Sequence, residues 1–148
     1  MSAYTTIVVG TDGSESSLKA VERAGALAGE SAALVIACAY FPNDRGAGGA
    51  ADVLKDEAYQ VTGSSPTEEI LRSAKERATQ AGAGDNIDAR SVKGAPVDAL
   101  LQLVSDTKAD LLVVGNKGLN SIAGRLLGSV PADVARKSAC DVLIVHTT

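Results

Sequence analysis

The stretch 115–130 combines glycines with two serines and two cationic residues, Lys117 and Arg125. It leaves an aliphatic run and enters a helical pattern through Gly128 and Ser129. Glycine lets the backbone approach an anion and adopt positive φ, and the N–H groups at a helix start favour negative charge. The stretch therefore predicts a phosphate-binding turn; the alternative is a strand-to-helix turn that needs glycine for its geometry alone.

A second polar segment, Gly10-Thr11-Asp12-Gly13-Ser14, follows the first aliphatic run of the chain. The Asp12 carboxylate could accept hydrogen bonds from ribose hydroxyls, help hold a divalent cation, or fix the turn before a helix. A carboxylate repels a nearby phosphate unless a metal lies between them, so a contact of Asp12 with ribose is favoured over one near the phosphate.

Better-known chemical motifs are absent from the sequence. It contains no GxxxxGK[ST] motif and no GxGxxG after the first strand, which argues against P-loop and dinucleotide sites. Its single histidine, His146, has no nucleophile at catalytic spacing, and Cys38 and Cys140 form no CxxC pair. Catalysis, a zinc site and a redox role are therefore not expected, and the cysteines are interpreted as free thiols near strands.

Composition favours an aliphatic globular domain. Of the 148 residues, 45% are hydrophobic and 3% aromatic, and the net charge of −4 argues against a broad nucleic-acid surface. No run has the length of a membrane span, and the N-terminus lacks the pattern of a signal peptide. We therefore expect a cytoplasmic protein.

Short β-branched runs alternate with amphipathic patterns along most of the chain. Strands are predicted at 6–10, 34–40, 87–92, 110–115 and 141–146, the third of them weak and near an edge. Helices are predicted at about 15–28, 70–81, 96–104 and 130–137. The alternation indicates a doubly wound parallel five-stranded sheet, which carries ligands at the carboxyl ends of its strands where the strand order reverses.

The connection 41–65 is long for a compact domain. A short helix at about 51–59 is plausible within it. Loop length alone leaves two interpretations open: a segment that covers a ligand, or a tolerated surface excursion.

The chain resembles the universal stress protein family over residues 1–148. The resemblance rests on the segment 8–14, on Gly115-x2-Gly118-x9-Gly128-Ser129-Val130, and on the closing run 141–145. It implies one α/β domain with helices on both faces of a Rossmann-like sheet of order 3-2-1-4-5, similar to the adenine nucleotide alpha hydrolase fold. It also implies a homodimer formed through the last strand.

The same resemblance implies an adenine-nucleotide site. Adenine is expected near the ends of the first two strands and the phosphates on the glycine-rich stretch. The expected binding residues are Gly10, Thr11, Asp12, Ala39, Gly115, Asn116, Gly118, Arg125, Gly128, Ser129 and Val130. No catalytic residue and no resident metal are expected.

Finer resemblance, at the N-terminal start and in the segments 51–57, 94–100 and 144–148, is to a branch that binds cyclic AMP. It implies a non-catalytic receptor or reservoir for cyclic AMP that binds ATP more weakly. Lys117 departs from that branch, and it could shift preference toward ATP or simply face solvent. Two alternatives stay open: a slow Mg²⁺- or Mn²⁺-dependent ATPase or autophosphorylating protein that uses Asp12, and a partner-binding dimer with a vestigial pocket.

Overall fold

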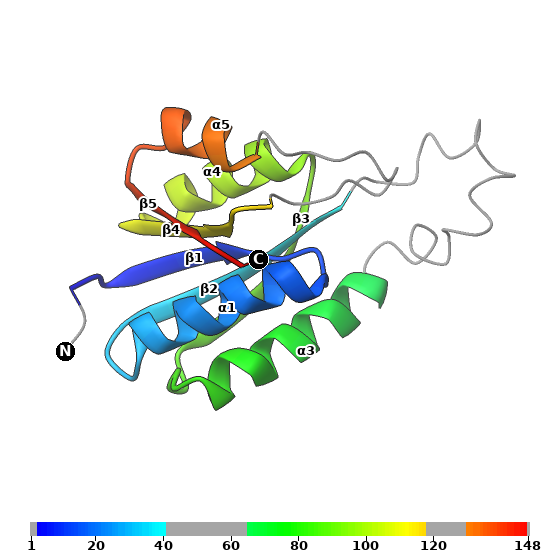
Figure 1. Ribbon diagram of the computed structural model, residues 1–148, viewed down its shortest axis with the longest axis vertical. Coiled ribbons are helices and arrows are strands. Elements are labelled where there is room, and N and C mark those ends of the chain that lie inside the picture. Colours follow the sequence, from blue (N-terminus) through cyan, green and yellow to red (C-terminus); the bar gives the residue numbers. More distant parts are fainter. Residues whose placement is uncertain (1–2, 41–64, 118–129, 148) are drawn as a thin grey trace, which may run out of the picture.

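The computed structural model describes residues 3–40, 65–117 and 130–147 (Figure 1). Its strands are β1 (Thr6–Gly10), β2 (Ala33–Tyr40), β3 (Ile87–Lys93), β4 (Leu111–Gly115) and β5 (Asp141–Val145). Its helices are α1 (Glu15–Ala28), α3 (Ser65–Gln80), α4 (Pro96–Thr107) and α5 (Val130–Lys137). Each predicted strand is present, with bounds that shift by at most one residue.

The strands form one parallel sheet in the order β3-β2-β1-β4-β5, which confirms the expected topology. The order reverses between β1 and β4, which pair directly through Val9 and Val113. In a doubly wound sheet this reversal opens a crevice beyond the carboxyl ends of the two strands. Weakly patterned β3 lies at one edge, as predicted, and β5 lies at the other.

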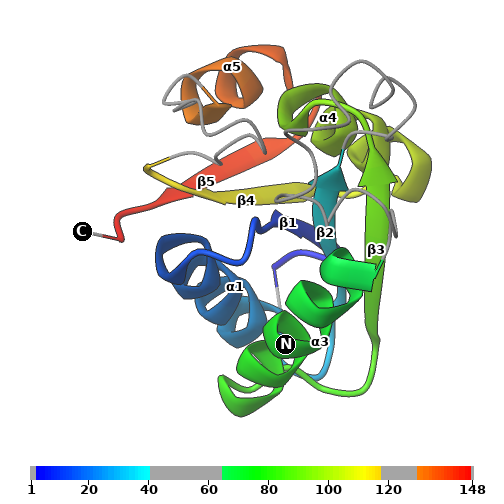
Figure 2. The same cartoon turned by 90° about the vertical axis from the view of Figure 1, so that its right-hand side faces the viewer.

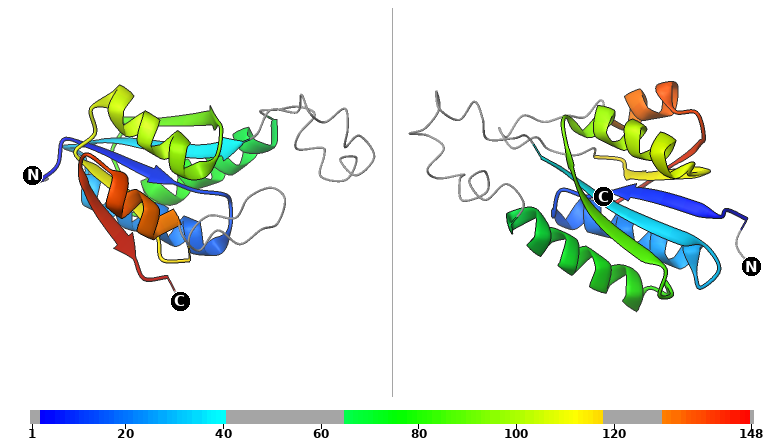
Figure 3. Two further views of the ribbon diagram at one scale, coloured as in Figure 1. Left: turned by 90° about the horizontal axis from the view of Figure 1, so that it is seen from above. Right: turned by 180° about the vertical axis from the view of Figure 1, so that it is seen from behind.

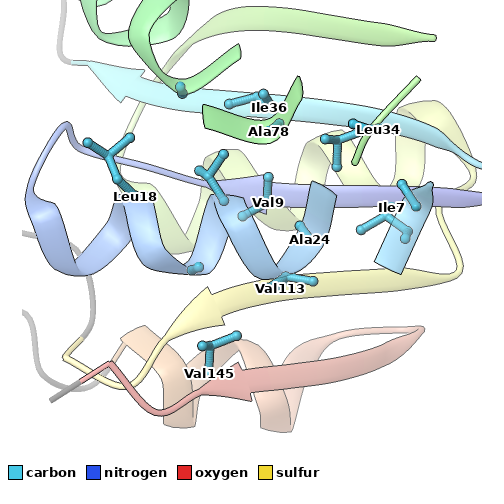
Figure 4. Close-up of a cluster of buried hydrophobic side chains, with 14 of the residues drawn as sticks. Ile7, Val9, Leu18, Ala24, Leu34, Ile36, Ala78, Val113 and Val145 are labelled. Carbon is cyan, nitrogen blue, oxygen red and sulfur yellow. The ribbon is translucent and has the colours of Figure 1, made fainter. Parts of the chain in front are cut away.

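Two helical layers cover the sheet, α1 and α3 on one face and α4 and α5 on the other (Figure 2; right-hand view of Figure 3). Successive residues of β1 supply both layers: Ile7 and Val9 are buried against α1, and Val8 is buried on the side of α4 and α5. Figure 4 shows the first cluster, in which aliphatic side chains from four strands meet α1 and α3. This packing fixes α1 against β1, and with it the turn at residues 11–14 that joins them.

Helix α3 begins earlier than predicted. Its first turn, from Ser65, is polar, and the apolar pattern that located the helix starts only at Ile70. Thr67 in that turn is buried, and its hydroxyl lies 2.6 Å from the Ser91 hydroxyl of β3. A tertiary contact therefore extends the helix where periodicity gave no signal. The helix predicted at 51–59 lies outside the described residues.

Asp110, just before β4, links the start of β1 to the start of β4 through hydrogen bonds of its side chain. Its carboxylate accepts hydrogen bonds from the backbone N–H groups of Thr5 and Thr6, each at 3.0 Å. Desolvation acts to raise the pKa of this carboxyl, but the N–H donors outweigh it and hold the pKa below its usual value. The Asp110 carboxylate therefore stabilises the fold in its charged form.

Replacement of Asp110 by asparagine is expected to lower the free energy of unfolding near neutral pH. Because the pKa is lowered in the folded state, this contribution is present above about pH 4 and is lost as the pH falls further. Urea unfolding at pH 7 and pH 3 checks this, with Asp106→Asn on the exposed end of α4 as control. An equal effect of Asp110→Asn at both pH values contradicts the assignment.

No helix within the described part of the chain combines the length and the apolar character needed to cross a bilayer.

Candidate functional site

The fold brings the starts of the two polar segments singled out in the sequence, at residues 10–12 and 115–117, to one edge of the sheet. Thr11 and Asp12 directly follow β1, and Asn116 directly follows β4. Since β1 and β4 are parallel neighbours, both chain segments leave the sheet at the edge where the strand order reverses, which is the place where doubly wound sheets bind ligands. Figure 1 shows α1 starting at the same edge.

The turn between β1 and α1 is held by its own hydroxyl groups. Thr11 is 1% exposed, and its hydroxyl lies 2.8 Å from the Ser17 hydroxyl and accepts a hydrogen bond from Gly13 N–H at 3.1 Å. The Ser17 hydroxyl also accepts from Asp12 N–H at 3.2 Å. The Thr11 side chain is therefore buried within the turn and shapes it from inside.

Asp12 performs the turn-fixing role considered in the sequence analysis. Its Oδ1 accepts a hydrogen bond from Ser14 N–H at 2.9 Å, and Ser14 in turn caps α1 by accepting from Ser17 N–H at 3.1 Å. The Asp12 side chain is half-buried, and a carboxylate can accept about four hydrogen bonds. The turn bond is thus compatible with a ribose contact, which stays a prediction.

The described residues contain no group of three or more His, Cys, Asp and Glu side chains placed to hold a metal ion.

On β2, Ala39 is half-buried near the carboxyl end of the strand, two residues beyond Ala37, the partner of Gly10 in the sheet register. Neighbouring Cys38 faces the α1 side and is 3% exposed. Burial raises the pKa of the Cys38 thiol to about 12, and the charge of Asp12 adds to the shift. Cys38 is therefore a packing residue. The other cysteine, Cys140, lies just before β5 and is half-buried.

Alkylation of the native protein at pH 8 is expected to modify Cys140 and to spare Cys38. The thiolate is the reactive form, and the raised pKa together with burial withholds it at Cys38. Peptide mass analysis after iodoacetamide treatment, with and without denaturant, measures the difference. The Cys140→Ser variant serves as control, because Cys38 is then the cysteine that remains. Rapid labelling of this variant in the native state contradicts the prediction.

At the end of β4, Gly115 is buried and is the sheet partner of Val145. The next residue, Asn116, donates its N–H to the Val145 carbonyl oxygen at 2.8 Å. Its side-chain Oδ1 accepts from both the N–H and the hydroxyl of Thr147, at 2.8 and 2.9 Å, and the Thr147 hydroxyl lies 2.6 Å from that of Ser16. Asn116 thus begins the turn in a fixed position.

Ser16, Ser17 and Thr147 were not predicted as residues of the site. Ser16 and Thr147 are 131 residues apart in the chain, so no local spacing could have linked them. The one available signal was the density of hydroxyl residues at the start of the first predicted helix.

The predicted phosphate-binding residues Gly118, Arg125, Gly128 and Ser129 lie outside the described residues. Val130 begins α5, and its side chain is buried among those of α4 and the sheet. Any ligand contact at Val130 would therefore come from its backbone. Lys117 is exposed.

Comparison with known proteins gives consistent results. A model of the universal stress protein family matches residues 3–146. The chain is 63% identical over 148 residues to universal stress protein Rv1636 of Mycobacterium tuberculosis, and the match covers 100% of both chains.

Solved structures agree with the fold. One, described as a universal stress protein in complex with cAMP, is 56% identical, covers 99% of this chain and 100% of its own, and superposes with a TM-score of 0.75. The universal stress protein UspA from Lactobacillus plantarum is 20% identical over 98% of this chain, with a TM-score of 0.72. That second likeness supports the fold alone.

Proposed function

Because this chain belongs to the universal stress protein family, we propose that it binds an adenine nucleotide at the crevice between β1 and β4, cyclic AMP in preference to ATP. The observation that carries the proposal is the 56% identity, over 99% of the chain, to a universal stress protein solved in complex with cAMP. The convergence of the Asp12 and Asn116 turns at the strand-order reversal supports the same location.

In this proposal different described residues contact different parts of the nucleotide. Backbone groups of Gly10 and Ala39 contact adenine, and the Asp12 carboxylate accepts hydrogen bonds from ribose. The Gly115–Asn116 turn leads toward the phosphate. Each of these groups binds or orients the ligand in this proposal, so the protein acts as a receptor or reservoir.

The phosphate contacts of the proposal involve Gly118, Arg125, Gly128, Ser129 and the backbone of Val130. Four of these residues lie outside the described part of the chain, so they stay predictions. A single phosphate charge needs fewer cations than the triphosphate of ATP, and the two cations of this stretch, Lys117 and Arg125, could serve either ligand.

We also propose that the protein is a cytoplasmic homodimer joined along β5. This strand is last in the sheet order, and its Ile144 is 42% exposed. An aliphatic edge strand tends to pair with another chain unless it is covered. Sedimentation of the protein with Ile144→Lys tests the dimer, since a charge at the edge should yield monomers.

Calorimetric titration of cyclic AMP and of ATP, each with and without Mg²⁺, tests the function. We expect cyclic AMP to bind with at least tenfold higher affinity than ATP, and without dependence on Mg²⁺. At a ligand concentration of 100 Kd the native state gains about 2.7 kcal/mol, or roughly 5–10 °C in Tm. Absence of both heat and thermal shift with every adenine nucleotide would favour the partner-binding alternative, whereas ADP accumulation with Mg²⁺ would favour the ATPase.

A further inference from the structure

We infer that Thr147 is a positioning residue for the nucleotide site, through which the segment after β5 sets the shape of the turn after β4. The inference rests on the proposed function and adds a residue that contacts the turn instead of the ligand. Its basis is a chain of hydrogen bonds from Ser16 through Thr147 to Asn116.

The direction of these hydrogen bonds follows from counting protons. The Thr147 hydroxyl donates its one proton to Asn116 Oδ1 at 2.9 Å, so at its 2.6 Å contact with Ser16 it accepts. Thr147 N–H makes a second bond to the same Oδ1 at 2.8 Å. The Asn116 side chain thus accepts two hydrogen bonds from Thr147, whose hydroxyl in turn accepts one from Ser16.

Packing adds to the hydrogen bonds. Thr147 is 7% exposed, and its methyl group lies 3.4 Å from the position that a Cβ on Gly115 would occupy. The backbone N–H, hydroxyl and methyl of Thr147 therefore all face the Gly115–Asn116 turn. One backbone group and two side-chain groups of a single residue therefore contact this turn and restrict its movement.

The chain of hydrogen bonds also joins the two halves of the site. Ser16 lies in the first turn of α1, four residues after Asp12, and Asn116 is the first residue after β4. Thr147 therefore links the proposed ribose side to the strand that leads to the phosphate. Loss of the link should let the two segments move independently, so that part of the ligand's binding free energy is spent on ordering them.

The test compares two substitutions at the same residue. Thr147→Val keeps the shape and the backbone N–H but removes the hydroxyl, whereas Thr147→Ser keeps the hydroxyl and removes the methyl. We expect Thr147→Val to weaken cyclic AMP binding about tenfold in calorimetry, and Thr147→Ser to stay within about threefold of the original chain. Ser16→Ala, which removes the other end of the chain of bonds, should weaken binding in the same direction.

Thr107→Val provides the matched control. The Thr107 hydroxyl is part-buried and donates to the Leu103 carbonyl oxygen at 2.8 Å, at the end of α4 on the opposite edge of the sheet. The Thr107→Val substitution should lower Tm without a change in the affinity for cyclic AMP. Equal affinity of Thr147→Val and the original chain, or failure of Thr147→Ser to retain binding, overturns the inference. If the original chain binds no adenine nucleotide, the proposed function itself fails.

Discussion

Substitution of Gly25 by alanine is expected to destabilise the protein by about 2 kcal/mol and to lower Tm by roughly 4–8 °C. Gly25 lies on α1 where it crosses α3, and an added Cβ would lie 2.7 Å from the Ala78 carbonyl oxygen and 2.9 Å from the Ala78 Cα. Both atoms belong to backbone, so relief requires the helices to separate. The overlap outweighs the better helix propensity of alanine, which is worth about 1 kcal/mol.

Thermal and urea unfolding measure this effect, with Ala26→Ser as the control on the same helix. Ala26 is exposed, so its substitution should change the free energy of unfolding by less than about 0.5 kcal/mol. If Gly25→Ala proves as stable as the original chain, the two helices do not approach as closely as the structure shows.

Removal of the Asp12 carboxylate is expected to cause the largest loss of ligand affinity. Asp12→Ala deletes both the proposed ribose acceptor and the hydrogen bond to Ser14 N–H that fixes the turn. Asp12→Asn keeps an oxygen able to accept from Ser14 but loses the charge. We expect cyclic AMP to bind about 100-fold more weakly to Asp12→Ala and about tenfold more weakly to Asp12→Asn, since hydrogen bonds to charged groups are the stronger ones.

Calorimetry of the folded variants separates the two roles of Asp12. Asp106→Ala is the control, because Asp106 is exposed near the end of α4 and accepts a hydrogen bond there from Gln102. A turn-fixing role alone predicts a lower Tm for Asp12→Ala with affinity largely kept. That outcome would remove Asp12 from the proposed ribose contact while leaving the rest of the site untouched.

The strands and most helices could be predicted because their signals are local. Runs such as 6–10 and 111–115 are aliphatic and β-branched, and a buried parallel strand needs that composition on both of its faces. The strand order came from a family resemblance, since periodicity alone does not say which strands are neighbours. The start of α3 was wrong because its first turn depends on a contact between Thr67 and Ser91.

The site was partly predictable for the same reason. Asp12 and Gly115 follow strong strands, and parallel topology brings such positions together. The role of Thr11 could not be anticipated, because its hydroxyl is buried against Ser17 and only coordinates reveal which way a turn side chain points. Thr147 was missed because its partners are remote in sequence.

The hydrogen bonds of Thr147 affect how the protein can be fused to others. Any polypeptide that continues past Thr147 leaves from the carboxyl edge, beside Ser16 and Asn116. Any that precedes Thr5 leaves from the opposite edge, where Asp110 holds the backbone. A fluorescent reporter attached after Thr147 should therefore change its fluorescence when a ligand binds at this edge, and it should also alter ligand affinity. The same reporter attached ahead of Thr5 should do neither.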